Sequence, residues 1–333
     1  MPPKPLLPFE IVKRTVLVKK ESSPTKHGVV PEQRQIRDYL KLGVINLDKP
    51  RGPSSHQVSD YVKRITGSKK AGHSGTLDPN VTGVLPVALD DATKALISLL
   101  SAGKEYVCSM HMHKEVSEKD ILAVFKKFTG TIKQLPPIHS AVKRQLRERT
   151  IYYLELIEIK GQEVLFRVGC QAGTYIRKLC HDMGESMGIG AHMAELRRTK
   201  AGPLHESTIT TLHDLADAYH YFKEKGDERR LRELVIPVEA AISHLPKIVI
   251  ADNVIYPLTH GATVHAPGVV SVESGIKKGD QVAVMSLKKE LVALATVKMS
   301  SEQIIKAKNG AVAKSDRVVM DPNLYPKMGD KPE

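Results

Sequence analysis

The sequence predicts an α+β fold in which a mixed-sheet domain precedes a small C-terminal β-barrel. A chain of 333 residues is long enough to divide into two domains. Strand and helix patterns follow one another without the regular βαβ order of a doubly wound sheet, which favours the α+β class. Beyond residues 244–247 the pattern changes to short strands separated by glycines, which is typical of a small barrel.

The mixed-sheet domain is predicted to begin with a buried strand at 43–48. Ser54 or Ser55 can cap the helix that follows, and Gly67 can end it. Apolar alternation, helical spacing and a capping box at 117–120 predict the later elements. The further strands are 84–89, 106–113, 151–159 and 164–169, and the further helices are 91–100, 117–128, 173–187 and 209–222. The predicted barrel strands are 247–250, 261–267, 281–286 and 291–299.

The two predicted domains leave a segment at each end of the chain. Residues 1–36 are rich in Pro, Lys and Ser and hold one apolar patch, so we expect an extension that adds a strand and packs on the C-terminal domain. The mixed-sheet domain then covers 37–244 and the barrel 245–322. Residues 323–333 form a C-terminal tail.

The charge balance favours a polyanionic partner. The chain has 50 Lys and Arg against 37 Asp and Glu, which gives a net charge of +13. Basic side chains displace the counterions condensed on phosphates, so such an excess favours nucleic acid. The excess is clustered between residues 143 and 200, in three patches. These patches are Lys143, Arg144, Arg147 and Arg149; Arg177 and Lys178; and Arg197, Arg198 and Lys200. The alternative is a solvated basic face without a ligand.

Composition also excludes several classes of protein. No apolar run approaches about 18 residues, so no membrane span is predicted. The first ten residues lack the pattern of a secretory signal, and the three scattered cysteines favour reduced thiols. We therefore expect a cytoplasmic protein. Histidines such as His111 and His113 lack the second half of a metal-binding pattern, so neither a metal nor a cofactor is expected.

The segment from Ala71 to Pro79 is the strongest local signal for chemistry. It places one carboxylate, Asp78, in a glycine-rich turn between a basic helix end and a buried apolar run. Gly72 and Gly75 permit close backbone approaches, and Pro79 stiffens the chain after the acid. An acid held in this way suits a nucleophile or a proton acceptor. From these residues alone, a surface turn capped by Asp78 is an equal alternative.

Four motifs in order resemble the TruB family of pseudouridine synthases. The first is Gly72–Pro79 with the run Gly83–Val87, and the second is Lys104-Glu105-Tyr106. The third is Gly173–Arg177, and the fourth is Leu196–Arg198. Within the family, the segment Val142–Arg147 is most similar to the dyskerin-type subunit of H/ACA ribonucleoproteins in its short archaeal form. The C-terminal barrel resembles a PUA domain, which binds RNA.

This resemblance implies a reaction that isomerises uridine to pseudouridine within RNA. The family's essential acid corresponds to Asp78, and its ion-pair partner corresponds to Arg177. Tyr106 would stack on the uracil, and Leu196 would pack on the other side of the pocket. The reaction gains and loses no atoms, so the chemistry requires no redox cofactor or metal. The target uridine must be flipped out of its helix to react.

The resemblance also suggests which residues meet the RNA and which proteins join the complex. His73 would lie near the emptied base stack, and Thr76 would contact the loop or the RNA backbone. The basic residues expected to contact RNA are Lys143, Arg144, Arg147, Arg197 and Arg198. Lys49 and Pro50 could brace the catalytic loop. The expected partners are a guide RNA, its substrate RNA, a Gar-type protein, a Nop10-type protein and a kink-turn-binding relative of a ribosomal protein.

Two other functions remain open at the level of sequence. One is a stand-alone tRNA pseudouridine-55 synthase, which performs the same chemistry without a guide. The other is a non-catalytic RNA scaffold or chaperone that keeps the fold. A glycosidase would need paired carboxylates around the sugar, and Asp48 is the only nearby candidate for a second acid.

Overall fold

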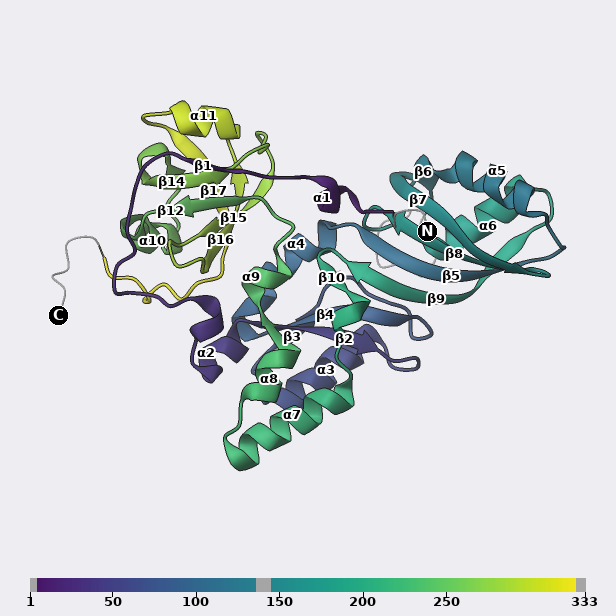
Figure 1. Cartoon of the computed structure of the whole chain (residues 1–333), viewed down its shortest axis with the longest axis horizontal. Helices are drawn as coiled ribbons and strands as arrows, with labels where there is room; N and C mark the ends of the chain where they lie inside the picture. The colour runs from purple at the N-terminus through teal and green to yellow at the C-terminus, as the bar shows by residue number, and fades with distance from the viewer. Residues whose placement is uncertain (1–4, 136–144, 328–333) are drawn as a thin grey trace.

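Two β-sheets organise the described part of the chain, a ten-stranded sheet and a seven-stranded sheet (Figure 1). The computed structural model describes residues 5–135 and 145–327. The large sheet runs in the order β11-β2-β4-β9-β5-β8-β7-β6, with β3 also paired to β4 and β10 to β9. Mixed strands and helices with a separate C-terminal sheet confirm the predicted α+β class.

The strands of the large sheet come from the middle of the chain. They are β2 (Gly43–Lys49), β3 (Ala71–His73), β4 (Thr82–Leu89), β5 (Lys104–Met112), β6 (Gly130–Gln134), β7 (Arg147–Lys160), β8 (Glu163–Cys170), β9 (Ala191–Ala201), β10 (Leu204–His205) and β11 (Val235–Pro237). The helices around it are α2 (Ile36–Lys41), α3 (Ser55–Thr66), α4 (Leu96–Ser101), α5 (Glu118–Phe128), α6 (Ile176–Ser186), α7 (Leu212–Lys225), α8 (Arg229–Leu234) and α9 (Val238–Ala241).

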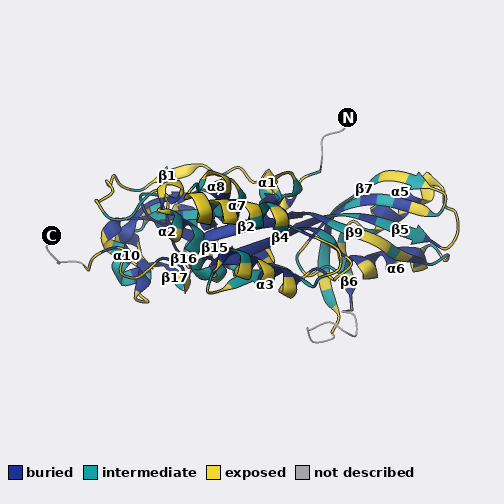
Figure 2. Ribbon diagram, turned by 90° about the horizontal axis from the view of Figure 1, so that it is seen from below, coloured by how far each residue is buried: buried dark blue, intermediate teal, exposed yellow. Residues whose placement is uncertain are grey.

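The large sheet consists of two halves with separate cores. The first half, β11, β2, β4 and β3, shares a core with α3 and α7. The second half, β9, β5, β8, β7 and β6, shares a core with α5 and α6. The halves meet where β4 pairs in parallel with β9, through only Thr82–Arg197 and Gly83–Arg198. We call this short pairing the joint. Figure 2 shows β2 and β4 as buried strands in the middle of the molecule.

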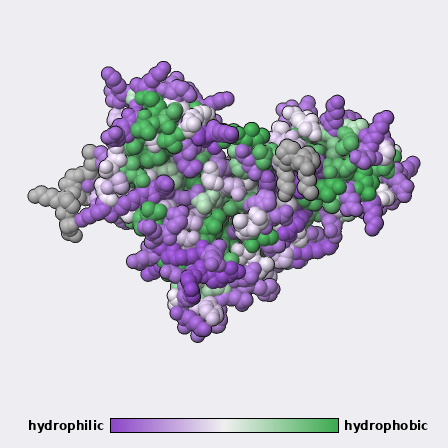
Figure 3. Space-filling view, viewed as in Figure 1, coloured by the Kyte–Doolittle hydropathy of each residue, from purple (hydrophilic) through white to green (hydrophobic). Residues whose placement is uncertain are grey.

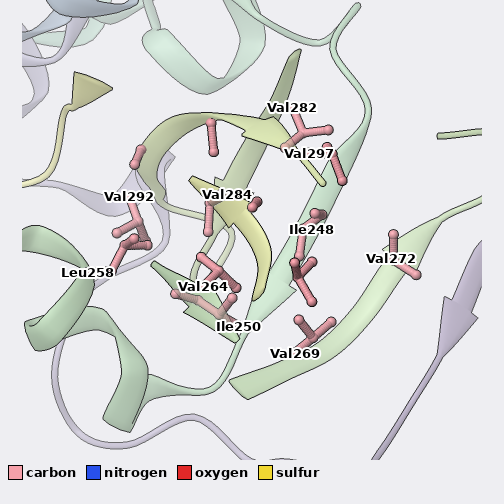
Figure 4. Packing of buried hydrophobic residues seen from close by; sticks show 14 of the residues in the cluster. Ile248, Ile250, Leu258, Val264, Val269, Val272, Val282, Val284, Val292 and Val297 are labelled. Carbon is pink, nitrogen blue, oxygen red and sulfur yellow. The ribbon is translucent and has the colours of Figure 1, made fainter. Parts of the chain in front are cut away.

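The seven-stranded sheet surrounds a third apolar core, built largely from Val and Ile (Figure 4). Its strands are β1 (Val16–Val18), β12 (Lys247–Ile250), β13 (Val264–His265), β14 (Val269–Glu273), β15 (Gln281–Met285), β16 (Leu291–Val297) and β17 (Ala311–Val318). The helices α10 (Asp252–Thr259) and α11 (Ser301–Lys306) flank it. A further cluster, which includes Val44 and Val84 on one side and Met285 and Leu294 on the other, packs this sheet against the first half of the large sheet.

The N-terminal segment contacts both sheets. The strand β1 pairs antiparallel with β14 at the edge of the seven-stranded sheet. The short helix α1 (Pro8–Ile11) lies between the two parts of the molecule in Figure 1. Leu7, which precedes it, is fully buried, and Phe9 packs edge-on against His244. The predicted packing on the C-terminal domain therefore accounts for only some of the contacts that this segment makes.

Several predicted elements differ from the observed ones. The strand β9 was missed because its sequence is rich in Arg, Lys and Glu, although its buried charges find partners in the sheet. The helix predicted from residue 173 begins at Ile176, after Gly173 with a φ of +79°. The helix predicted at 91–100 starts as a 3₁₀ segment, Asp90–Ala95. The predicted strand 261–267 shortens to Val264–His265, while β14, β17 and α11 were not foreseen.

Among the described residues, no helix is both long enough and apolar enough to cross a bilayer.

Candidate active site

Asp78 and Arg177 form an ion pair across the joint of the large sheet. Asp78 lies in the loop that leads from β3 to β4 on the first half, and Arg177 lies in the first turn of α6 on the second half. The Arg177 Nη2 atom donates to the Asp78 Oδ2 atom over 2.6 Å. Both side chains are more than half exposed, at 62% for Arg177 and 57% for Asp78. The carboxylate is therefore oriented by an arginine and still open to a ligand.

The loop that carries Asp78 is fixed by hydrogen bonds at both ends. Ser55, the first residue of α3, bonds to Leu77 twice, with its Oγ atom donating to the carbonyl and accepting from the backbone N–H. Leu77 itself is buried, which anchors the residue directly before the acid. The backbone N–H of Ser74 donates to the carbonyl of Pro86 over 3.0 Å. The loop is thus held ready before any ligand arrives.

Three buried cations lie near this loop, and two of them, Lys49 and Arg198, donate hydrogen bonds to it. The Lys49 Nζ atom donates to the carbonyls of Pro50, Pro79 and Val81 over 2.9–3.1 Å. The Lys104 Nζ atom donates to the carbonyls of Leu99, Leu100 and Ala102 at the end of α4. The Arg198 guanidinium donates to the carbonyls of Gly75 and Val84. Backbone carbonyls thus replace the water that a buried charge would lose.

Burial changes the ionisation of all three cations. Removal from water lowers the pKa of Lys104 to about 7, and it lowers the pKa of Lys49 and of Arg198 as well. Burial raises the pKa of the neighbouring Tyr106 hydroxyl, while the charge of Arg198 opposes this rise. A deprotonated tyrosine is therefore disfavoured here, which suits a ring that stacks rather than one that takes up a proton.

Tyr106 and Leu196 lie on the two strands beside the joint. Tyr106 pairs with Arg198 between β5 and β9, where the register shifts by a bulge, and Leu196 pairs with Cys108 two residues further on. Tyr106 is partly buried, and its hydroxyl feels the charge of Asp78. Leu196 packs at the margin of the second core. The structure thus gathers the four expected catalytic residues around the joint, and their roles stay predictions.

The expected RNA-binding residues fall into different environments. Thr76 is exposed two residues before Asp78. His73 lies on β3, and burial lowers the pKa of its ring. Arg147 begins β7 opposite Gln134 of β6. Lys143 and Arg144 lie outside the described residues.

Arg198 was predicted to face RNA, and the structure contradicts direct contact. Its side chain is 1% exposed and braces the catalytic loop instead. Its neighbour Arg197 is 34% exposed, yet both of its Nη atoms reach Asp48 or Thr82 and its Nε atom donates to Glu206. Two carboxylates already compensate Arg197, so it is a weaker phosphate ligand than a free arginine.

One buried carboxylate near the site escaped the reasoning from sequence. Glu105 is 4% exposed and accepts hydrogen bonds from the hydroxyls of Tyr153 and Thr199. It lies 3.8 Å from both Lys200 and Arg167. Because Glu105 directly precedes Tyr106, this network fixes the strand that carries the ring. The only available signal was an acid inside the motif Lys104-Glu105-Tyr106.

No group of three or more His, Cys, Asp or Glu side chains within 5–135 and 145–327 is arranged to hold a metal ion.

Comparison with known families accounts for most of the chain. Residues 63–176 match the N-terminal domain of the TruB family of pseudouridylate synthases, and residues 177–243 match the C-terminal domain of tRNA pseudouridylate synthase B. Residues 246–319 match the PUA domain, and residues 7–59 match the DKCLD domain. The chain is 52% identical over 321 residues to a probable tRNA pseudouridine synthase B of Methanopyrus kandleri, covering 96% of this chain and 95% of that protein.

The chain belongs to the TruB family of pseudouridine synthases.

Other members of the TruB family are equally similar. The probable tRNA pseudouridine synthase B of Thermococcus onnurineus is 53% identical over 326 residues, which is 97% of each chain. A chain in the crystal structure of a Cbf5–Nop10–Gar1 complex matches with a TM-score of 0.93 and 50% identity, over 97% of this chain and 99% of that one. A chain of an H/ACA ribonucleoprotein bound to substrate RNA with 2′-deoxyuridine matches with a TM-score of 0.90 and 48% identity, over 97% and 99%.

Proposed function

We propose that this TruB-family enzyme converts uridine to pseudouridine in RNA, as the catalytic subunit of an H/ACA guide-RNA particle. The observation that carries the proposal is the exposed Asp78–Arg177 pair at the joint, with Tyr106 beside it. In the reaction the N1–C1′ bond breaks, the uracil turns, and C5 bonds to C1′. The proton on C5 then leaves and N1 takes up a proton, so the atoms balance without a cofactor.

Each side chain at the joint has a distinct role in this reaction. Asp78 either attacks the nucleotide or removes the C2′ proton, and both roles use the ionised carboxylate that Arg177 orients. Tyr106 stacks on the uracil, which holds the loosened base without stopping its rotation; such stacking contributes about 1–3 kcal/mol per base. Leu196 covers the other side of the base and excludes water.

The substrate must be an RNA whose target base can leave its stack. An exposed acid on a braced loop receives a flipped nucleotide, and flipping costs a few kcal/mol. The net charge of +13 supplies the attraction to phosphates that offsets this cost. The face drawn in Figure 3 is largely hydrophilic, with apolar patches on the seven-stranded sheet and on the second half of the large sheet.

The partners of the particle follow from the similar complexes. Proteins about half identical to this chain were crystallised with Nop10 and Gar1, and in a ribonucleoprotein with substrate RNA. We propose a Gar-type protein, a Nop10-type protein and a kink-turn-binding relative of a ribosomal protein as partners. The C-terminal PUA domain would hold the guide RNA. Three free, buried cysteines agree with a cytoplasmic location.

The second candidate is a stand-alone tRNA pseudouridine-55 synthase. The relatives named probable tRNA pseudouridine synthase B favour it. An activity assay distinguishes the two functions. The purified protein is first given tRNA alone, and then a guide RNA, its matched RNA and the partner proteins. Guide-dependent product supports the particle, whereas product from tRNA alone, with no response to a guide, supports the stand-alone enzyme.

Asp78→Asn tests the catalytic assignment. The variant keeps the size of the side chain and removes its charge, so release of tritium from 5-tritiated uridine should stop while RNA binding persists. Asp60→Asn is a matched control, because Asp60 forms an exposed ion pair with Arg64 over the same 2.6 Å. Release that survives in Asp78→Asn would overturn the assignment of Asp78 as the catalytic acid.

A further inference from the structure

The two halves of the active site belong to two halves of the sheet that are weakly joined. Asp78 lies on the first half, whereas Arg177 and Tyr106 lie on the second. The backbone ladder at the joint has two residue pairs, while β5 pairs with β9 along its full length. Polar side chains also cross the joint, since Arg198 donates to Gly75 and Val84 and Arg197 pairs with Asp48. A rotation that separates Asp78 from Arg177 would have to strain these contacts, but not the apolar core of either half.

The seven-stranded sheet packs mainly on the first half. The cluster around Val44, Val84 and Leu294 packs these two parts together as one apolar interface. The core of the second half contains residues of β5, β8, α5 and α6 but none of the seven-stranded sheet. Among the described residues of the second-half strands, only Ala201, at the end of β9, joins the cluster that packs the seven-stranded sheet.

The N-terminal segment from Leu7 to Thr25, here called the strap, contacts both the second half and the seven-stranded sheet. Its near anchor is on the second half, where Glu10 binds the Lys200 Nζ atom over 2.9 and 3.1 Å. Lys200 is paired with Glu105 across β9 and β5, next to Tyr106. Leu7 is fully buried beside Gly103, the residue before β5. The near anchor thus rests on the strand that carries the stacking ring.

The far anchor of the strap is on the seven-stranded sheet. After the pairing of β1 with β14, the Lys19 Nζ atom donates to the carbonyls of Ile304, Ile305 and Ala307 at the end of α11. Thr25 donates twice to Asp252. Between the anchors, Ile11 is 64% exposed and Val12 is 50% exposed, so this stretch gains nothing from burial. Figure 1 shows the strap crossing from one part of the molecule to the other.

We propose that the strap is a tie that limits opening of the joint, with Leu7 and Glu10 as positioning residues for catalysis. It holds the second half of the large sheet at a fixed distance from the seven-stranded sheet, and so keeps Arg177 and Tyr106 against Asp78. The inference rests on the proposed pseudouridine synthase function, since the rate of that reaction reports the geometry of the joint.

Slackening the strap tests this directly. Inserting Gly-Gly-Ser between Val12 and Lys13 leaves both anchors intact and adds about 10 Å of chain. In the reconstituted particle we expect the single-turnover rate at saturating RNA to fall about tenfold, because the reacting groups are held less well. RNA affinity and the melting temperature should stay unchanged. A wild-type rate in this variant would overturn the proposal.

A double-mutant cycle gives an independent test. Glu10→Gln weakens the near anchor, and Lys19→Met weakens the far anchor. If both act through one tie, the double variant loses no more rate than either single variant, whereas independent effects add. Ile11→Ser, in the exposed stretch, is the control and should keep the wild-type rate. Additive losses would overturn the proposal.

The activity of the wild-type protein separates a failure of the strap proposal from a failure of the proposed function. The assay uses whichever RNA the wild-type protein modifies, either tRNA or a guide-matched RNA. Wild-type protein inactive on both would contradict the proposed function itself. If the wild-type protein is active and the Gly-Gly-Ser insertion leaves its rate unchanged, only the strap proposal is contradicted.

Discussion

At the scale of single residues, the basic side chains of the site differ in how far they are exposed to solvent. Arg177 stays exposed and pairs with Asp78, whereas Lys49, Lys104 and Arg198 are buried among backbone carbonyls. An exposed ion pair adds little to stability, about 0–1 kcal/mol, so the Asp78–Arg177 pair serves orientation. Lys49 and Arg198 hold the loop in place, Lys104 holds the end of α4, and the burial of these charges has a measurable cost.

Lys104 should make stability depend on pH. Burial lowers its pKa to about 7 in the folded protein, whereas an exposed lysine has a pKa of about 10.4. Between these values the unfolded chain binds more protons, so the contribution of Lys104 to stability rises as the pH is raised from neutral. Urea unfolding at pH 7 and pH 9 should therefore show wild type gaining stability relative to Lys104→Met. Parallel curves for the two proteins would contradict the lowered pKa.

At the scale of elements, the joint between β4 and β9 decides the geometry of the site. Gly83 has a φ of +101°, and a Cβ atom there would lie 2.2 Å from the Arg198 carbonyl oxygen. Only glycine lets the two backbones approach so closely. The strand β9 could not be predicted from its composition, because its charged residues are buried only once β4 and β5 flank it.

Gly83→Ala should open the joint. The variant combines a strained φ with a clash against backbone, and we expect it to lower both stability and the single-turnover rate. Gly130→Ala is a matched control, because Gly130 has a φ of +104° and no atom within 4 Å of an added Cβ. The control should lose about 1–2 kcal/mol from backbone strain alone. Equal losses of stability and rate in the two variants would show that the close approach at Gly83 is unimportant.

At the scale of the whole molecule, the net charge of +13 favours a polyanionic partner such as RNA. The strap adds a third element to the two-sheet organisation, because it connects the second half of the large sheet to the seven-stranded sheet. Basic residues differ in what we expect them to contribute: the exposed ones are predicted to bind phosphate, whereas buried Lys49 and Arg198 donate to carbonyls of the loop.

Salt dependence of RNA binding should distinguish these two kinds of basic residue. The logarithm of the affinity falls linearly with the logarithm of salt, with a slope of about −0.7 to −0.9 per phosphate contact. Lys143→Ala, in the predicted RNA-binding segment, should reduce that slope by about one. Replacing the buried Arg198 by Met should weaken catalysis and leave the slope unchanged. A reduced slope in the Arg198 variant would mean that this residue does reach RNA.

The sequence by itself determined the chemistry of this protein. Residue types and spacing in four short motifs were enough to predict the family, the central role of Asp78, and RNA as substrate, because such motifs are local. Only the tertiary structure decided which of the adjacent Arg197 and Arg198 is buried, where the sheet is weakly joined, and what the strap touches. Burial and pairing depend on strands that are distant in the chain, and no local pattern records which strands become neighbours.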